Sequence, residues 1–579
     1  MSNAGFDALI VPQADPHMSE YLAPHWQLRR WLSGFTGSAG DLVVTADKAL
    51  LWTDSRYFLQ AAQQLDGSDI ELMKDGLPDT PSINTYLCEH LEPRARVGID
   101  DSLFSCSAYD ALEAALKDRE IYLLPETVAE DDWIDRPALP DAPIYIHQAR
   151  YAGRTAVEKI GAILAIVRAH GQEAIFISAL DDIAWTLNLR SDDVRHTPVF
   201  TAYLFLSEGR KILFTDPRKL DDEVRAYLSD AGVEARPYSA VFGFLNKELN
   251  LPTFYDVART NAAIRRALGH FGVAADFSPA GQLKSIKNET QIEGIRKAME
   301  RDGAALVRSF MEIERRLAEG VHTTETDVAD ILRHYRSAAP EWRDESFGTI
   351  AGYGPHGAIV HYEADAESAS TLRPEGLLLV DSGAQYLDGT TDITRTIALG
   401  TPTAEEKRDF TLVMKGHICL GTMTFPEGTR GTQLDALARQ FLWREGMSYL
   451  HGTGHGVGHF LGVHEGPQRI ALIWVDVPMQ PGMLTSNEPG LYRTGVHGIR
   501  CENLVLCREA FTNEFGRFYN FETVTLFPFD LSLFDTSIMT DAEIDWLNSY
   551  HSMVRERLTP YLNETEAAWL AAKTAKLTR

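Results

Sequence analysis

The sequence contains few cysteines and no long apolar run. Its five cysteines, in 579 residues, are odd in number and lack the spacing of a metal-binding motif. We therefore expect buried thiols in a reducing compartment, and the cytoplasm is the predicted location. No stretch reaches the roughly 18 apolar residues that a membrane-spanning helix needs. The segment Met1–Asp15 has no basic start before an apolar run, so no signal peptide is expected.

Basic residues are also scarce relative to acidic ones. Lys and Arg total 55 against 82 Asp and Glu, which gives a formal net charge of −27 and a pI near 5.1. A surface that binds phosphate groups needs clustered Lys and Arg, so binding to nucleic acid is not expected. A chain of this length exceeds what one hydrophobic core supports, and about two to four domains are expected.

The first half of the chain carries a weak internal repeat. The segment Ala49–Arg56 resembles Lys211–Arg218, because each is an apolar run that ends in Thr-Asp-x-Arg. The repeat suggests two related α/β units in tandem, joined by the proline-rich, acidic segment Pro125–Pro143. Good helix formers from Lys287–Leu317 predict a long amphipathic helix, and the tail Thr540–Leu577 is also helical in character.

Two segments of the last third share one design, in which an acid stands on each side of a turn. In the first, an apolar run ends at Asp381, Asp388-Gly389 is a turn signal, and a Thr-rich strand begins near Asp392. In the second, Glu488 precedes a Pro-Gly turn and Glu502 follows the return of the chain. Each acid alone is more commonly a turn cap or a surface charge. Their repeated arrangement predicts that each turn brings its two acids together.

Four acids beside apolar runs need compensating charge, because a buried cluster of carboxylates is strongly unfavourable on its own. Two divalent cations carry four positive charges and balance four carboxylates. Ligand sets that are rich in oxygen suit divalent metals. The sequence therefore predicts a two-metal centre.

Between the acid pairs lies a glycine-rich segment with several histidines, which starts at His451 and continues through His455 and His459 to His464. A glycine in a helix interior costs about 1 kcal/mol relative to alanine, so a regular helix is not expected. An extended segment would leave a bare glycine face for close backbone packing, but the residues alone leave the local backbone open. We expect a ligand or catalytic group among these histidines, with His459 as an ordinary hydrogen-bonded core or surface residue. His361, at the end of another apolar run, is a weaker candidate.

Six short motifs stand together in this part of the chain. They are Asp381-Ser-Gly-Ala-Gln-Tyr, Asp388-Gly-Thr-Thr-Asp392, His451-Gly-Thr-Gly-His455-Gly, Val463-His464-Glu-Gly-Pro467, Asn487-Glu488-Pro-Gly and Ile499-Arg-Cys-Glu502-Asn503. Together they resemble the aminopeptidase P and prolidase branch of the pita-bread metallopeptidases. Segments Ser33–Gly40, Trp52–Phe58 and Phe521–Phe529 extend the resemblance to the long, three-domain cytosolic aminopeptidase P form. Small departures are His459, where a small or neutral residue is expected, and Cys501, where an aliphatic residue is usual.

The resemblance implies a fold of the α/β (α+β) class. Two tandem creatinase-like N-terminal α/β domains, 1–125 and 126–284, would precede a pita-bread catalytic domain, 285–579, that includes a C-terminal extension. It also implies hydrolysis of the bond before proline, which releases the first residue from peptides with proline in second place. Two divalent metal ions would be the only cofactors. Manganese is favoured by the resemblance alone, and the ligand types also suit cobalt, zinc or iron.

The resemblance assigns a role to each candidate site residue. Five metal ligands are implied: Asp381, Asp392, His455, Glu488 and Glu502. Glu488 would also move a proton from the nucleophile to the leaving proline nitrogen. His361 and His464 would hold the substrate and the oxyanion, His451 would line the same cleft, and Arg500 would keep neighbouring carboxylates ionised.

Two other functions fit the same motifs. A prolidase would cleave only Xaa-Pro dipeptides, and the tandem N-terminal domains and the extension argue against it. A non-catalytic pita-bread binding protein would retain the fold but typically lose ligands, and here none is missing. The family also suggests a homodimer, with peptides as the only other partners.

Overall fold

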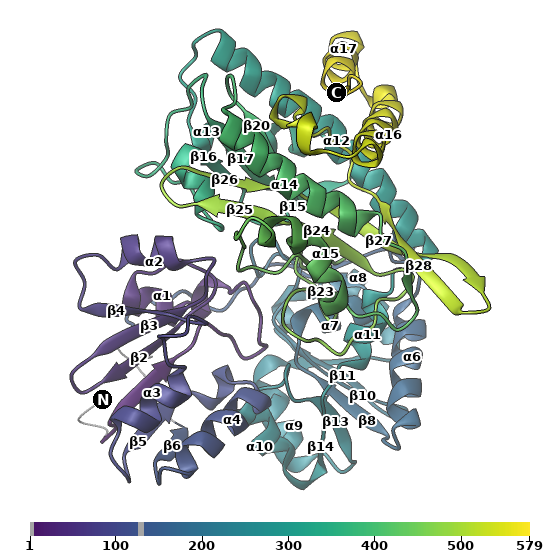
Figure 1. The fold of residues 1–579 in the computed structure, drawn as a ribbon. Helices are drawn as coiled ribbons and strands as arrows, with labels where there is room; N and C mark the ends of the chain where they lie inside the picture. The colour runs from purple at the N-terminus through teal and green to yellow at the C-terminus, as the bar shows by residue number, and fades with distance from the viewer. Residues whose placement is uncertain (1–4, 126–132) are drawn as a thin grey trace. The chain divides into compact units, whose positions relative to one another are not determined.

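The computed structural model describes residues 5–125 and 133–579, which form two compact units (Figure 1). One unit comprises Met1–Ala149 and Arg154–Lys284, and the other comprises Arg150–Gly153 and Ser285–Arg579.

The first unit contains two six-stranded sheets that have the same strand order and the same pattern of directions. In spatial order, the first sheet consists of β4 (Ile70–Lys74), β3 (Ala49–Thr53), β2 (Asp41–Thr45), β1 (Ala8–Val11), β5 (Arg96–Ile99) and β6 (Tyr122–Pro125). The second consists of β12 (Glu234–Pro237), β11 (Lys211–Thr215), β10 (Tyr203–Ser207), β8 (Ala174–Ile177), β13 (Thr253–Asp256) and β14 (Gly272–Ala275). In each sheet, the middle strand β1 or β8 pairs with an antiparallel neighbour on one side and a parallel neighbour on the other.

The internal repeat is confirmed, because its two copies occupy equivalent strands, β3 and β11. Each strand is followed by an Asp–Arg ion pair, Asp54 with Arg56 at 2.7 Å and Asp216 with Arg218 at 2.6 Å. Part of the predicted linker, residues 126–132, lies outside the described residues. Its first residue, Pro125, ends β6, and residues 133–143 have no helix or strand.

Helices surround these sheets because their apolar faces bury against the strands. The helix α6, for example, begins with a capping box of Thr155 and Glu158 and buries Ile160, Ile163 and Val167. The α-helices of six or more residues are α1 (Leu28–Ser33), α2 (Phe58–Gln64), α3 (Ile83–His90), α4 (Cys106–Lys117), α6 (Ala156–Ala169), α7 (Leu180–Leu187), α8 (Asp222–Asp230), α9 (Val241–Lys247), α10 (Ala262–Leu268) and α11 (Pro279–Ser285). This unit also contains a short antiparallel ribbon of β7 (Tyr145–Ile146) and β9 (Leu189–Arg190).

The C-terminal unit is built from antiparallel strands packed against long helices. Its larger sheets are β15 (Trp342–Glu345), β18 (Ala384–Tyr386) and β19 (Gly389–Thr390); β16 (Ile350–Tyr353), β17 (Leu377–Ser382) and β20 (Ile393–Ala398); and β21 (Phe425–Pro426), β28 (Gly516–Thr523), β27 (Asn503–Asn513) and β24 (Leu484–Asn487). Two short ribbons are β22 (Gly454–His455) with β23 (Arg469–Ile470), and β25 (Gly490–Arg493) with β26 (His497–Arg500). The helices are α12 (Glu289–Ala318), α13 (Glu325–Ser337), α14 (Ala404–Gly421), α15 (Gly431–Trp443), α16 (Asp541–Leu558) and α17 (Glu564–Lys573).

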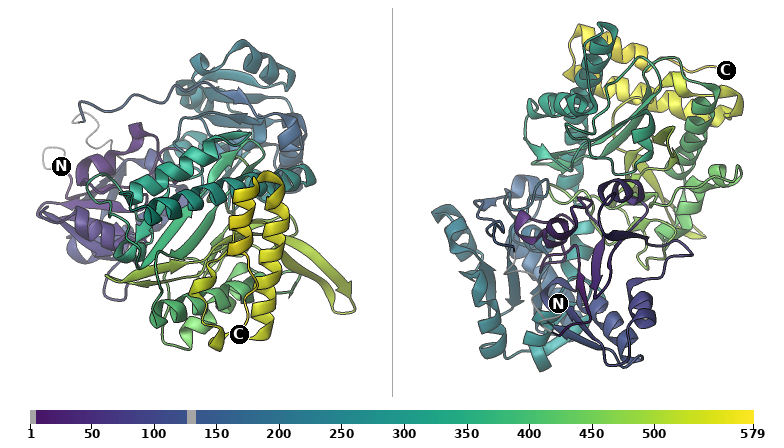
Figure 2. Two further views of the ribbon diagram at one scale, coloured as in Figure 1. Left: turned by 90° about the horizontal axis from the view of Figure 1, so that it is seen from above. Right: turned by 90° about the vertical axis from the view of Figure 1, so that its left-hand side faces the viewer.

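The predicted long helix and helical tail are both confirmed. Helix α12 starts at an Asn288 capping box and buries one face in the main core of this unit. It lies beside α16 and α17 (Figures 1 and 2), and Arg308 joins it to Glu566 of α17 at 3.0 Å. The C-terminal helices therefore belong to the body of the unit.

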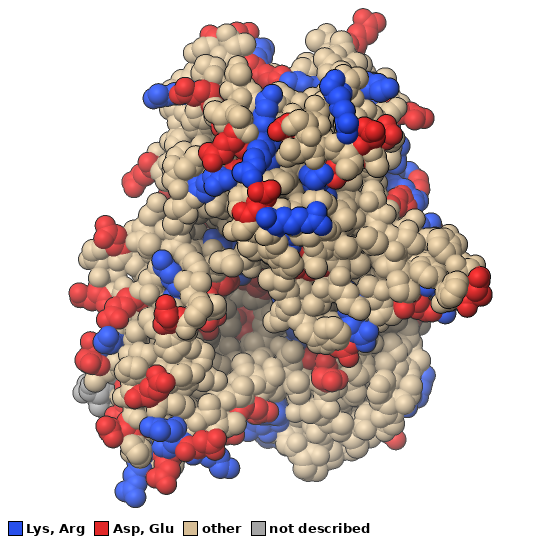
Figure 3. Space-filling model, viewed as in Figure 1, with Lys and Arg blue, Asp and Glu red and all other residues tan. Residues whose placement is uncertain are grey.

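The described surface carries charges of both signs. On the face drawn in Figure 3, Lys and Arg are interspersed with Asp and Glu. No described helix combines the length and the apolar character that crossing a bilayer requires.

Candidate metal centre

The two acid-bearing turns fold as hairpins, as predicted. Strand β17 pairs antiparallel with β20, so that Asp381 lies opposite Thr394 and Asp392 stands just before β20. Strand β24 pairs with β27, and Glu488 and Glu502 are the residues just beyond that pairing. The ribbon of β25 and β26 connects the two glutamates. In each hairpin, the second acid therefore lies near the first, at the same end of the paired strands.

The two hairpins and the histidine segment meet at one point. One potential ligand atom from each of Asp392, His455 and Glu502 lies within 4.8 Å of the other two. The Nε2 atom of His455 is 3.5 Å from Asp392 Oδ2 and 3.3 Å from Glu488 Oε1. Three separate segments, spread over 110 residues from Asp392 to Glu502, thus supply neighbouring imidazole and carboxylate groups.

The backbone around His455 is extended, which settles the conformation that the sequence left open. Gly454 and His455 form β22, and a Cβ added to Gly454 would lie 2.0 Å from the carbonyl oxygen of Ser486. Glycine is required there because the backbone of the next hairpin passes so close. The Nδ1 atom of His455 is 3.0 Å from the Gly456 carbonyl oxygen, so it carries the proton and donates. Nε2 then presents a lone pair towards the acids, as a metal-ligating histidine requires.

Burial and the charges of neighbouring acids raise the pKa values of three carboxylates in this cluster. Burial, followed by the charges of Asp381 and Glu488, raises the pKa of Asp392 well above its usual value. Burial, followed by Asp392, Glu488 and Asp381, does the same to Glu502. The pKa of Glu488 is raised to about 7, again chiefly by burial. All four acids therefore act on one another electrostatically, and together they call for cations.

Two carboxylate oxygens of this cluster, Oδ1 of Asp381 and Oε1 of Glu502, are buried and have no hydrogen-bond partner among the described residues. Their companion oxygens are engaged, since Arg500 Nη2 donates to Asp381 Oδ2 at 2.6 Å and Thr394 Oγ1 donates to Glu502 Oε2 at 2.8 Å. A buried acceptor without a partner is costly, and a divalent cation satisfies it. The donor set of carboxylates and one imidazole thus fits divalent metal ions.

A hydrogen-bonded chain leads from Asp381 to His451. The guanidinium of Arg500 also donates through Nη1 to the hydroxyl of Tyr492, at 2.8 Å, and that hydroxyl lies 2.8 Å from His451 Nε2. His451 Nδ1 is 2.7 Å from the carbonyl oxygen of Gly452 and donates to it. Nε2 is therefore the acceptor, and the Tyr492 hydroxyl donates to it. Burial raises the pKa of Tyr492 to about 12, so the phenol stays protonated at neutral pH.

The remaining predicted histidines lie at different depths. The ring of His464 meets that of His455 edge-on, with centroids 4.4 Å apart, and its charge opposes the rise of the Glu488 pKa. His361 is half-buried and follows Val360, whose carbonyl oxygen accepts from Arg500 at 3.3 Å. His459 is buried.

The loop that carries His361 is anchored by the carboxylate of Glu325, the first residue of α13. This fully buried side chain accepts from the backbone amides of Tyr353 and Ser370, both at 2.7 Å, and from the hydroxyl of Tyr362 at 2.9 Å. His356 Nδ1 is also 2.9 Å away. One carboxylate therefore ties together both ends of the segment around His361.

Tyr492 and Thr394 are two residues of the site that were not predicted from the sequence. Tyr492 stands two residues beyond Gly490 and four beyond Glu488, and residues at this spacing in an extended chain point to one side. That spacing could have indicated it. Thr394 could have been inferred in the same way, because it lies two residues after Asp392.

Comparisons with known proteins agree with this geometry. The model of metallopeptidase family M24 matches residues 293–509, and the C-terminal region of peptidase M24 matches 517–577. Two models of the creatinase/prolidase N-terminal domain match residues 1–132 and 135–291. Aminopeptidase P2 of Arabidopsis thaliana is 42% identical over 99% of this chain and 86% of its own length, and a probable Xaa-Pro aminopeptidase P of Laccaria bicolor is 42% identical over 100% and 92%.

The chain belongs to the Xaa-Pro aminopeptidase P family. It is a family of metallopeptidases, so the fold predicted from the motifs is confirmed: two creatinase-type N-terminal domains followed by a pita-bread domain. The X-prolyl aminopeptidase of Caenorhabditis elegans, a cytosolic enzyme with a di-nuclear active site, superposes with a TM-score of 0.95. It is 34% identical to this chain, and the match covers 99% of this chain and 95% of the other.

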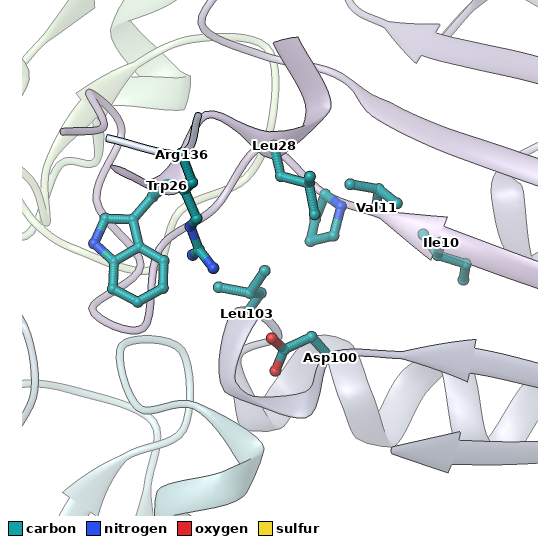
Figure 4. Close-up of a pocket in the computed structure, with 8 residues that line it drawn as sticks. Ile10, Val11, Trp26, Leu28, Asp100, Leu103 and Arg136 are labelled. Carbon is teal, nitrogen blue, oxygen red and sulfur yellow. The ribbon is translucent and has the colours of Figure 1, made fainter. Parts of the chain in front are cut away.

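A small pocket in the first unit lies where β1 and β5 end (Figure 4). Trp26, Leu103 and Arg136 are among its lining residues, and the guanidinium of Arg136 lies over the Trp26 ring at 5.4 Å. Its volume is about 20 Å³, which accommodates about one water molecule. This pocket is too small for a peptide.

Proposed function

We propose that this chain hydrolyses the bond between the first residue of a peptide and a proline in second place, using two divalent cations. The observation that carries the proposal is the convergence of Asp392, His455, Glu488 and Glu502 on one point, with ligand atoms within a few ångströms of one another. Similarity over the full length of Xaa-Pro aminopeptidases supports the substrate class and favours this activity over that of a prolidase.

We assign the metal-ligand role to five side chains, which are Asp381, Asp392, His455, Glu488 and Glu502. The bound cations would polarise the scissile carbonyl and lower the pKa of a water molecule, which supplies the nucleophile. The unpartnered oxygens of Asp381 and Glu502 and the tautomer of His455 support this assignment. Arg500 holds the outer oxygen of Asp381 and so fixes the direction of the inner one.

Glu488 takes the proton of the attacking water and passes it to the leaving proline nitrogen. Burial raises its pKa to about 7 before metal is bound, so near neutral pH this carboxylate can both accept and release a proton. His464 lies against His455, at the edge of the cluster, and donates to the substrate carbonyl as negative charge develops there. His361 holds the substrate, and His451, fixed by Tyr492, lines the same cleft.

Proline suits this mechanism because its nitrogen carries no hydrogen and its ring fixes the backbone angle φ. Peptidases that bind that N–H, or that need a flexible chain, cannot use such a bond. The further proposals are manganese as the native metal, a homodimer, a cytoplasmic location, and three domains bounded at 1–125, 126–284 and 285–579. The equal topology of the two N-terminal sheets supports the first of these boundaries.

The test is a series of peptides and metals. Protein stripped with a chelator is supplied separately with manganese, cobalt, zinc or iron and assayed on Arg-Pro, Arg-Pro-Pro and a longer Arg-Pro peptide. Metal-dependent release of arginine from the tripeptide and the longer peptide is expected, with manganese giving the highest rate. Cleavage confined to the dipeptide would indicate a prolidase instead, and absence of a stoichiometric metal pair would indicate a binding protein.

A further inference from the structure

Arg395, three residues after Asp392, is buried and is surrounded by oxygen atoms that carry no formal charge. Its Nη1 donates to the carbonyl oxygens of Thr394 at 2.9 Å and Glu502 at 2.5 Å. Its Nε donates to the carbonyl oxygen of Pro528 at 3.1 Å. Its planar fork therefore joins strand β20 to the start of β27 and to the chain that follows β28.

The third nitrogen of this guanidinium reaches the C-terminal extension. Nη2 donates to Asn503 Oδ1 at 2.8 Å, to the carbonyl oxygen of Phe527 at 2.6 Å and to the hydroxyl of Tyr550 at 3.0 Å. Tyr550 lies on α16, is 4% exposed, and stacks on Trp546 with centroids 5.4 Å apart. Tyr550, a residue of the C-terminal tail, thus supplies one of the hydrogen-bond acceptors of Arg395.

The arrangement leaves Glu502 little freedom. Its backbone N–H donates to the carbonyl oxygen of Thr394 at 3.1 Å, and its own carbonyl oxygen accepts from Arg395. Its side chain accepts from Thr394 Oγ1 at 2.8 Å. The peptide unit and one carboxylate oxygen are fixed. The other oxygen, Oε1, is buried, and no residue in the described ranges forms a hydrogen bond with it. Arg395 therefore holds the backbone from which the Glu502 carboxylate extends, and Thr394 holds one oxygen of that carboxylate.

The same network continues to the other glutamate. Asn503 Nδ2 lies 3.2 Å from His417 Nε2, and His417 Nδ1 donates to the carbonyl oxygen of Asn487 at 3.1 Å. The amide of Asn487 returns a hydrogen bond to the carbonyl oxygen of His417 at 2.9 Å. Asn487 and Asn503 are directly opposed in the pairing of β24 and β27 and immediately adjoin Glu488 and Glu502. One group of side chains thus lies behind both glutamates.

We propose that Tyr550 of the C-terminal extension is a positioning residue of the metal centre, which acts through Arg395 on Glu502. The inference rests on the proposed metal-ligand role of Glu502. Outer residues that orient metal ligands typically change metal affinity or activity by roughly 10-fold to 100-fold when altered. Helix α16 is accordingly part of the scaffold of the site, although it supplies no ligand.

The test compares Tyr550→Phe with Tyr561→Phe in the full-length protein. Tyr550→Phe keeps the buried ring and removes the hydroxyl that Arg395 uses. Tyr561→Phe is the matched control, because it removes a hydroxyl of the same extension that contacts Glu300 at 2.7 Å. Calorimetric titration of the metal-free proteins with manganese should show two sites in each. Affinity should fall by about 10-fold in Tyr550→Phe and by less than about twofold in the control.

A second variant tests whether Tyr550 acts through Arg395. Arg395→Lys keeps the charge but cannot reach the same set of oxygens. If the two residues act together, Tyr550→Phe should weaken manganese binding much less in the Arg395→Lys background than in the wild type. Independent effects, whose fold-changes multiply, would overturn the proposal. If Tyr550→Phe does not fold, Arg395→Lys decides alone, since unchanged manganese affinity would then overturn the proposal.

A merely structural role gives a different pattern. It predicts that Tyr550→Phe lowers the melting temperature of the metal-free protein and leaves manganese affinity within about twofold of the wild type, which would overturn the proposal. If the proposal is correct, Tyr550→Phe should lower kcat at saturating manganese and leave KM for the peptide unchanged. Failure of the proposed function is distinguishable, because it would appear as a wild-type protein that binds two metals and does not cleave Arg-Pro-Pro.

Discussion

Removal of metal should reverse the pH dependence of stability of the C-terminal unit. In the metal-free protein, burial and neighbouring acids raise the pKa of Glu488 from 4.5 to about 7. The native protein then holds this proton more tightly than the unfolded chain, so the free energy of unfolding falls as pH rises between these values. At about 1.4 kcal/mol for each tenfold change in proton affinity, the effect is about 3 kcal/mol. Asp392 and Glu502, whose pKa values are also raised, act in the same direction.

Bound metal has the opposite effect. Cations compete with protons for the carboxylates, so the stabilisation by metal should grow with pH. A ligand present at 100 times its Kd adds about 2.7 kcal/mol per site, or about 5 kcal/mol for two sites. For a domain of this size, about 2 °C of melting temperature corresponds to each kcal/mol. Manganese should therefore raise the melting temperature by about 10 °C at pH 8 and by much less at pH 5.

The assay is thermal unfolding at pH 5 and pH 8, with chelator or with manganese, on the wild type and Glu488→Gln. The variant lacks the titrating group, so its metal-free form should lose less stability between the two pH values. The reasoning is refuted if the metal-free wild type is as stable at pH 8 as at pH 5. It is also refuted if manganese shifts the melting temperature equally at both.

Three further predictions concern single side chains. Glu488→Ala should abolish turnover while the circular dichroism spectrum is retained, and near-normal activity would disprove the proton-transfer role. Tyr492→Phe removes the hydroxyl that joins the imidazole of His451 to the guanidinium of Arg500, and kcat should fall about 10-fold. The control Tyr519→Phe should keep a kcat near that of the wild type. Equal losses of kcat in both variants would contradict a specific role for Tyr492. Glu325→Gln places an amide NH₂ against backbone N–H donors, so the loop that carries His361 should become more mobile. KM should rise about 10-fold while manganese affinity is unchanged. An unchanged KM would show that this anchor does not affect substrate binding.

Local signals were sufficient to predict the hairpins. A turn signal such as Asp388-Gly389 and alternating strand residues act over a few positions, so the pairing of β17 with β20 was within reach of the sequence. The long helix α12 was equally accessible, because its apolar periodicity and its freedom from proline are properties of one segment. Charge balance among four acids then indicated metals.

Other features depend on contacts that no local pattern encodes. Glycine is permissive, so the extended backbone at Gly454 became evident only from the approach of Ser486. The contact of Arg395 with Tyr550 joins residues 155 positions apart. Nothing in the sequence around either residue indicates the other. The link between the C-terminal tail and Glu502 therefore required the fold.

The twofold recurrence of one sheet topology in the N-terminal unit offers a built-in comparison. Asp54 with Arg56 and Asp216 with Arg218 form the same ion pair after the equivalent strands β3 and β11 of the two copies. A feature that is present in both copies is best explained by the structural needs of the turn that follows the strand in this kind of sheet. Specialisation for peptides should accordingly be sought among the features that only one copy possesses.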